Sequence, residues 1–221
     1  MVNSLNENVI AASYAASISR IASQYGPSEQ AMLEGTGITP AQLHNPNKLI
    51  SIEQNIKLTH NAVRLTGKPH LGLLVGQNLS LTAHGMMGIA VMSSKTYGDA
   101  LKVICEYIKT RVSAFTVAST VEKGTLSITL KEDSSIAEAS RTDPNIKEAL
   151  HFIISTMASS ISTVSKVLIP DNCNNYTYHF AHPTPEHIEE YEKVLGHNIH
   201  FNSTENSISA PASILTDQLP F

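Results

Sequence analysis

Histidine is the residue type with the clearest potential for chemistry here, because imidazole binds metals and transfers protons near neutral pH. Half of the histidines lie between residues 179 and 200. Zinc ligands must converge from defined spacings. His179 and His182 would point to opposite faces of a strand, and His187 falls in a following helix. We therefore interpret these histidines as surface residues, with His182 as a structural residue at the end of the strand.

Nucleophile and cofactor motifs are absent from the sequence. It contains no G-x-S-x-G elbow, no H-E-x-x-H helix, no Walker loop and no G-x-G-x-x-G after a strand. Neither Cys105 nor Cys173 lies in a nucleophile motif. The acidic pair Glu189-Glu190 lies on the solvated face of a predicted helix. We expect no enzymatic activity and no bound cofactor.

Some residues have the character of a ligand pocket, which is mostly apolar with a few placed polar groups. His84, which precedes Gly85, is either a polar anchor for an effector or a helix-start residue bonded to backbone carbonyls, and the second interpretation is favoured. Arg111 ends a predicted helix, where it could hold a carboxylate or complement the helix dipole. Methionines in this region either line an adaptable pocket or fill the core. The candidate ligand-binding residues are His84, Met87, Met92, Tyr97, Tyr107, Arg111 and His151.

Composition bounds the class of protein. The formal net charge is -4 and the 15 Lys and Arg residues are scattered, whereas nucleic-acid-binding domains carry a basic patch. This chain should therefore bind DNA poorly by itself. Two isolated cysteines favour a reducing compartment, and the N-terminal residues lack the pattern of a signal peptide. The apolar stretch 152–169 contains seven Ser or Thr, so we interpret it as a core helix rather than a membrane span, in a cytoplasmic protein.

The elements that must position these residues change character near residue 112. Before it, apolar residues recur every three to four positions, which predicts helices. These helices are expected over residues 10–25, 28–33, 51–65, 69–79 and 96–110. The helix over 51–65 has the spacing of a capping box at Ser51 and Gln54.

After residue 112 the pattern alternates with period two, which predicts a hairpin over 113–132. Asp143-Pro144 then predicts a long helix, and Thr184-Pro185 a shorter one. Strands are expected over residues 176–180, 199–201 and 207–209. The predicted fold is α+β: a helical N-terminal half followed by an antiparallel sheet with β-β-α-β-α-β-β order.

Two ordered blocks of residues carry a resemblance to a known family. The first comprises Gly72, Gly76, His84, Gly85, Gly88, Thr96, Ala100 and Leu101. The second comprises Phe180, His182, Pro185, Tyr191, Gly196, Ile199, Phe201, Asn206, Ile208, Pro211, Leu215, Leu219 and Pro220. Together they resemble the arabinose-binding-type N-terminal domain of AraC-type transcription regulators, in the branch that includes ornithine- and quorum-linked regulators.

This resemblance implies a single ligand-sensing and dimerisation domain over 1–221, helical over 1–111, α+β over 112–210, with the start of a linker at 211–221. It implies a small-molecule effector, for which a carboxylate is a candidate, and a homodimer joined through the apolar face of 10–25 or 96–110. DNA would be contacted only through a C-terminal helix-turn-helix domain that this sequence lacks, and no membrane partner is expected. The alternatives are a haem or metal sensor using His84, His151 or His182, or a small enzyme.

Overall fold

The computed structural model describes Leu5 and residues 7–221. The expectation of no signal peptide falls partly on residues 1–4 and Asn6, which lie outside the described residues. Helices precede the main sheet, as the change of apolar period near residue 112 predicts. The α+β fold class is therefore confirmed.

The N-terminal part contains a small sheet that the helical pattern does not predict. β1 (Asn8–Ala11) pairs antiparallel with β2 (Leu49–Ser51), so Ile10 lies opposite Ile50. Helix α1 (Ala12–Ser23) consequently begins two residues after Ile10. Pairing between segments about 40 residues apart overrides the local helical spacing of Ile10. The next helices are α2 (Glu29–Leu33) and α3 (Pro40–Leu43).

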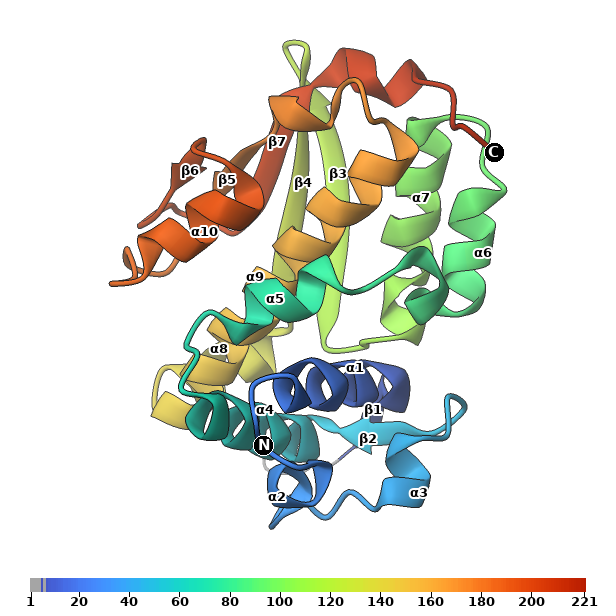
Figure 1. Ribbon diagram of the computed structural model, residues 1–221. Coiled ribbons are helices and arrows are strands. Elements are labelled where there is room, and N and C mark those ends of the chain that lie inside the picture. Colours follow the sequence, from blue (N-terminus) through green and yellow to red (C-terminus); the bar gives the residue numbers. More distant parts are fainter. Residues whose placement is uncertain (1–4, 6) are drawn as a thin grey trace.

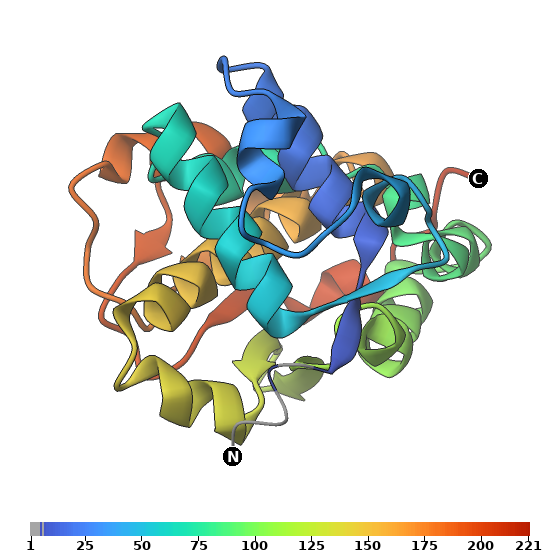
Figure 2. The same ribbon diagram turned by 90° about the horizontal axis from the view of Figure 1, so that it is seen from below.

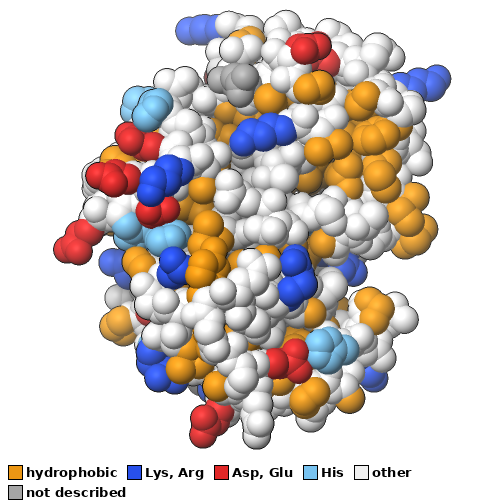
Figure 3. All heavy atoms as spheres, viewed as in Figure 1, with side chains coloured by type: hydrophobic (Ala, Val, Ile, Leu, Met, Phe, Trp, Pro, Cys, Tyr) orange, Lys and Arg blue, Asp and Glu red, His pale blue; other side chains and the backbone are white. Residues whose placement is uncertain are grey.

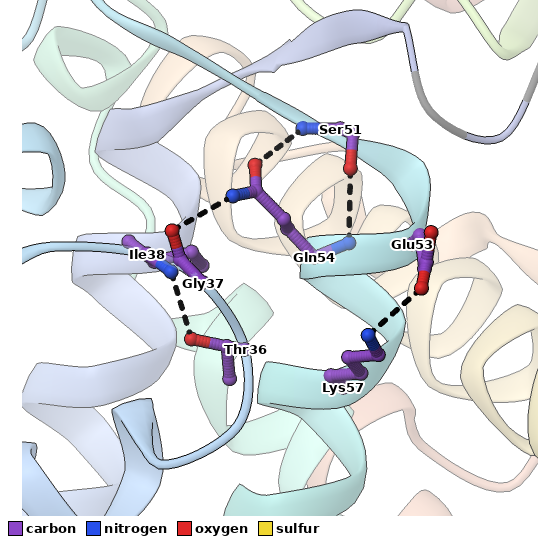
Figure 4. Close-up of polar contacts among 7 residues, drawn as sticks. All are labelled: Thr36, Gly37, Ile38, Ser51, Glu53, Gln54 and Lys57. Atoms are coloured by element: carbon purple, nitrogen blue, oxygen red, sulfur yellow. Dashed lines mark hydrogen bonds and ion pairs between the residues drawn. The ribbon is translucent and has the colours of Figure 1, made fainter.

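Helix α4 (Ile52–Thr66) begins with the predicted capping box. The Gln54 N–H donates to Ser51 Oγ over 3.1 Å, and the Ser51 N–H donates to Gln54 Oε1 over 3.0 Å. Figure 4 shows that the Gln54 amide also reaches the carbonyl of Gly37, at 3.1 Å, in the preceding loop. The box therefore fixes the start of α4 and ties it to the chain before β2.

The middle of the chain is made of short helices. They are α5 (Leu71–Gln77), the 3₁₀ segment η2 (Leu81–His84), α6 (Met86–Met92), α7 (Tyr97–Tyr107) and the 3₁₀ segment η3 (Ile108–Thr110). The Asp99 N–H donates to the hydroxyl of Thr96, so Thr96 caps α7 at the predicted start of that helix.

The main sheet has five strands in the order β3-β4-β7-β5-β6. They are β3 (Phe115–Glu122), β4 (Thr125–Glu132), β5 (Thr177–His179), β6 (Ile199–His200) and β7 (Ser207–Pro211). The hairpin pairs Val117 with Leu130 and turns at Gly124, where φ is +81°. All neighbours are antiparallel except β5 and β6, which run parallel. The expectation of a purely antiparallel sheet is wrong for that edge, because α10 (Ile188–Leu195) crosses over between the two strands.

Helix α9 (Pro144–Leu168) is the central helix of the molecule. Asp143 caps it and Pro144 occupies its first turn, as predicted, and the short helix α8 (Ser134–Ser140) precedes it. Figure 1 shows α9 crossing the sheet between α7 on one side and α10 on the other, and Figure 2 shows α4 lying across its N-terminal half, where the two helices are in contact. Among the described residues, no helix combines the length and the apolar character needed to cross a membrane.

The predicted start of the helix after Thr184 is wrong. Helix α10 starts at Ile188 rather than near Pro185, because residues 183–187 form irregular chain and a turn. There the His182 ring donates from Nδ1 to the Pro183 carbonyl over 2.8 Å.

The end of the chain is packed rather than irregular. Residues Ala212–Thr216 form the 3₁₀ segment η5, and Ile214 and Leu219 are buried. The Tyr97 N–H donates to the Asp217 carbonyl, so this segment lies against α7.

Candidate functional site

A cavity of about 130 Å³ lies between α9 and the helices α1, α4, α6 and α7. Most of its lining is aliphatic, with Phe152 as the aromatic residue from α9 and Val117 from β3. Met87 of α6 and Met157 of α9 also belong to the lining. A dry apolar cavity of comparable volume accepts a benzene-sized molecule. The cavity therefore has the apolar character of a small-molecule site.

The lining has few polar side chains among the described residues, and none of these side chains is charged at neutral pH: all are neutral residue types except His84, whose surroundings keep it neutral. They are Tyr14, Asn55, His84, Tyr97, Thr156, Ser160 and Ser165. Within the part of the chain that the structure describes, no Asp, Glu, Lys or Arg belongs to this lining. Such a surface discriminates by hydrogen bonds rather than by ion pairs.

His84 links two walls of the cavity. Its Nδ1 lies 2.8 Å from the Tyr14 hydroxyl of α1, and its Nε2 lies 3.4 Å from the Ser160 hydroxyl of α9. Burial, and to a smaller extent the nearby positive charge of Arg111, lower the pKa of His84 to about 4. The imidazole is therefore neutral at pH 7, with one nitrogen donating and the other accepting.

A triangle of hydroxyls occupies another part of the wall. The Tyr176 hydroxyl lies 2.7 Å from that of Tyr97 and 2.8 Å from that of Ser165, and Tyr97 and Ser165 are 3.1 Å apart. Burial raises the pKa of Tyr97 and of Tyr176, so both phenols stay protonated. Each hydroxyl can donate once and accept once within the triangle, which therefore needs no ligand to be satisfied.

Asn55 differs from the other polar lining residues because its amide is unpaired. It lies one turn into α4, lines the cavity and is 4% exposed. Its side chain makes no hydrogen bond to any other described residue, whereas most buried side-chain amides are bonded. The capping box at Ser51 and Gln54 fixes the helix turn that carries it.

Arg111 lies beside the cavity but outside its lining. Its Nη2 donates to Ser13 Oγ over 2.7 Å, and its guanidinium carbon lies 5.5 Å from the centre of the Tyr14 ring. Its Nε is buried and has no hydrogen-bond partner among the described residues. The guanidinium thus contacts the outer side of the Tyr14–His84 pair, and a ligand carboxylate in the cavity would not touch it.

The predicted site residues divide between the cavity and other places. His84, Met87 and Tyr97 line it, and their role in ligand binding stays a prediction. Met92 does not belong to the lining, although it lies on α6 with Met87. Tyr107 is 45% exposed at the end of α7, where its side chain faces away from the cavity.

His151 belongs to a different cluster, although Phe152 and Ile153 beside it line the cavity. Its ring centre lies 4.7 Å from that of His182, which packs against Phe180 and Tyr191. His182 is buried three residues after β5, in agreement with its predicted structural role. Among the described residues, no group of three or more His, Cys, Asp or Glu side chains is arranged to hold a metal ion.

Sequence reasoning missed several of the polar groups in the cavity. Tyr14 was assigned only to an apolar helix stripe, and Ser160 to a core helix. Asn55 carried a usable signal, because it follows Ile52 by three residues and precedes Thr59 and Ala62 on the buried face of α4. A polar amide at a core position of a predicted helix is a candidate for function.

The molecular surface shows no continuous basic patch on the face seen in Figure 3, where Lys and Arg side chains alternate with acidic ones. Hydrophobic side chains gather along the edge of this face that carries α6 and α7. Met86 is 77% exposed and Ile89 is 49% exposed, and both belong to α6. We call these two residues the α6 patch.

Comparison with known proteins gives one family match. A family model described as the arabinose-binding domain of AraC transcription regulators, N-terminal, matches residues 26–219. The ornithine utilization regulator of Pseudomonas aeruginosa is 26% identical over 207 residues, which cover 94% of this chain. An uncharacterized HTH-type transcriptional regulator of Mycobacterium bovis is 31% identical over 88 residues, which cover 39% of this chain and 26% of the regulator.

A solved structure shares the fold. The transcriptional regulator CdpR from Pseudomonas aeruginosa superimposes with a TM-score of 0.60 at 17% identity, over 91% of this chain. The chain spans 58% of the length of the ornithine utilization regulator and 56% of the CdpR chain. The agreement in fold extends over nearly all of the chain.

Proposed function

Because the chain belongs to the family of N-terminal arabinose-binding domains of AraC transcription regulators, we propose that its cavity is the effector site. The observation that carries this proposal is the cavity itself, with its apolar lining and its few placed polar groups. The role is regulatory rather than enzymatic, in keeping with relatives that are transcriptional regulators. The effector is a small cytoplasmic metabolite.

Binding would act through the helices that share the cavity. Helices α1, α4, α6, α7 and α9 all contribute to its lining, so a ligand contacts several elements at once. A ligand shifts a conformational equilibrium only by its differential affinity for the two states. A better fit to one packing of these helices would favour the corresponding arrangement of a helix-turn-helix region in the full-length regulator, and so change its fit to paired DNA half-sites.

We also propose that the regulator is a homodimer. The interface expected on residues 10–25 is not available, because Ile18 and Ile21 of that apolar face are buried in the core. Ala100 and Leu101 of α7 are buried in the same way. The α6 patch is an apolar helix surface that is exposed nearby, with Met86 the more exposed of its two residues, and it is the candidate interface.

Thermal denaturation with a metabolite library tests the effector site. A ligand at about 100 times its Kd stabilises the native state by about 2.7 kcal/mol. A hit should raise the melting temperature of the wild-type chain in a saturable way. It should fail to do so for Val164→Phe, which places a phenyl ring in the cavity.

A matched control lies on the same helix. Val167 is 48% exposed and outside the lining, so Val167→Phe should keep the full response to the ligand. If hits stabilise Val164→Phe as well as the wild type, the ligand binds elsewhere and the cavity is not the effector site.

A further inference from the structure

We propose that the cavity takes an uncharged, mainly apolar molecule with a carbonyl or hydroxyl group that Asn55 binds, and that His84 offers a second neutral contact. This inference rests on the proposed function, because it names the class of ligand for the same site. It replaces the carboxylate that sequence reasoning offered as a candidate.

The first argument is the absence of a counter-charge. Within the described part of the chain, no Asp, Glu, Lys or Arg side chain lines the cavity, and His84 is neutral there. A charged group transferred from water into such a surface loses its hydration without gaining an ion pair. A zwitterionic amino acid would lose hydration at both of its ends, and a carboxylate at one.

The second argument concerns the nearest cation. Arg111 already donates to Ser13 and lies against the ring of Tyr14, so a bound carboxylate would have to displace both side chains to reach it. The positive charge of Arg111 nevertheless reaches the cavity wall, because it lowers the pKa of His84. That charge disfavours an ammonium group in the cavity, and Arg111 does not belong to the lining that a bound carboxylate would contact.

The third argument is the unpaired amide. Asn55 is nearly fully buried against the cavity and has neither donor nor acceptor partner among the described residues. An amide donates to a ligand carbonyl and can both donate to and accept from a ligand hydroxyl. Either group would complete its hydrogen bonding without bringing a charge into the site.

His84 offers a second neutral contact. Its 2.8 Å bond to Tyr14 is short, whereas its 3.4 Å bond to Ser160 is long and easily exchanged for a ligand. The hydroxyls of Tyr97 and Ser165 already bond to each other and to Tyr176, so we expect these residues to contact the ligand without a hydrogen bond to it. The flexible side chains of Met87 and Met157 can adjust to the apolar part of the ligand.

Three aromatic probes of similar size and different charge test this inference on the chain as it stands. Benzamide is neutral, benzoate is an anion and benzylammonium is a cation at neutral pH. Titration followed by two-dimensional NMR should show benzamide binding at least about tenfold more tightly than either ion. The shifted resonances should include residues of α4, η2 and α9.

Three variants test whether benzamide binds in the cavity and whether Asn55 contributes to its binding. Asn55→Leu should weaken benzamide binding about tenfold, the equivalent of one lost hydrogen bond. Asn47→Leu, at an exposed position, should leave it unchanged. Val164→Phe should abolish it.

The outcomes distinguish the two proposals. If benzoate or benzylammonium binds as tightly as benzamide and Val164→Phe removes that binding, the ligand class is wrong and the effector site stands. If no probe binds, or if all bind Val164→Phe as they bind the wild type, both the ligand class and the cavity as a ligand site are contradicted.

Discussion

The neutral imidazole of His84 makes the stability of the protein depend on pH. Its pKa is about 4 in the folded state and 6.5 when unfolded, so the unfolded state binds a proton first as the pH falls. The stability that depends on the neutral imidazole is therefore fully present above pH 6.5 and is lost as the pH falls from about 6.5 to 4. The pKa difference, reduced for partial exposure, corresponds to about 2–3 kcal/mol. Urea denaturation across this pH range should show the loss.

The variant His84→Gln isolates this effect, because glutamine keeps hydrogen-bonding groups but does not titrate. It should show a flatter dependence of the unfolding free energy on pH than the wild type. His197→Gln is the control, since the His197 side chain is 85% exposed and should leave the profile unchanged. An unaltered slope for His84→Gln would mean that another group causes the acid sensitivity.

Replacing Asn55 with an apolar residue should change stability and ligand binding in opposite directions. An unsatisfied buried polar group destabilises the native state, and an apolar residue of similar shape removes that penalty. The Asn55 amide keeps some contact with solvent on the cavity side, so Asn55→Leu should raise the unfolding free energy by about 1 kcal/mol or less while it weakens ligand binding. Chemical denaturation without ligand measures the first effect, and a decrease in stability would show that the amide has a structural partner.

At the residue scale, the sequence indicated side-chain types better than it indicated the direction in which side chains point. Tyr97 and Tyr107 occupy one predicted helix, yet Tyr97 is buried beside the cavity and Tyr107 is exposed. Ten residues do not complete a whole number of turns at about 3.6 residues per turn, so the two rings point to different sides of α7. His151 shows the same limit, since its neighbour Phe152 points into the cavity instead.

At the element scale, the contact between α5 and α9 depends on glycine. A Cβ at Gly76 would collide with the carbonyl oxygen of Thr156 and lie 2.7 Å from the Cβ of Ser159. The close approach also lets Ser159 donate to the Leu73 carbonyl over 2.8 Å. These contacts hold the part of α9 that carries Ser160 to the cavity.

Gly76→Ala should therefore lower the unfolding free energy by about 2–3 kcal/mol, the usual effect of overpacking a core. For a chain of this size, each kcal/mol corresponds to about 2–4 °C in melting temperature, which calorimetry measures. Gln77→Ala, at the next and exposed position, should stay within about 0.5 kcal/mol of the wild type. Equal melting temperatures for the two variants would show that α5 and α9 can separate without loss.

Elements with local signals were predictable, and elements that depend on distant partners were not. The capping box of α4 and the Asp143-Pro144 start of α9 act within a few residues, so the sequence indicates them directly. Strand β1 forms only because β2 pairs with it across the intervening helices. The parallel edge of β5 and β6 likewise follows from the crossover through α10.

At the scale of the whole molecule, the fold class followed from the change of apolar period, but the packing of the tail did not. Residues 211–221 have the composition of a linker, yet their backbone bonds to Lys95 and Tyr97 hold them on α7. The packed tail, α7 and the α6 patch lie on the same side of the molecule (Figures 1 and 2). A change in the cavity wall formed by α6 and α7 would reach this surface directly, which is why the proposed dimer contact is placed there.

Self-association tests that placement. Met86 and Ile89 lie three residues apart on α6 and so share one face of the helix, where a charge would be buried on dimerisation. Met86→Glu should weaken a homodimer at least about tenfold, measured by sedimentation velocity over a range of concentrations. Val121→Glu introduces the same charge at the 52% exposed end of the β3–β4 hairpin and should leave association unchanged. If Val121→Glu dissociates the dimer and Met86→Glu does not, the interface lies on the hairpin, and the α6 patch has another role.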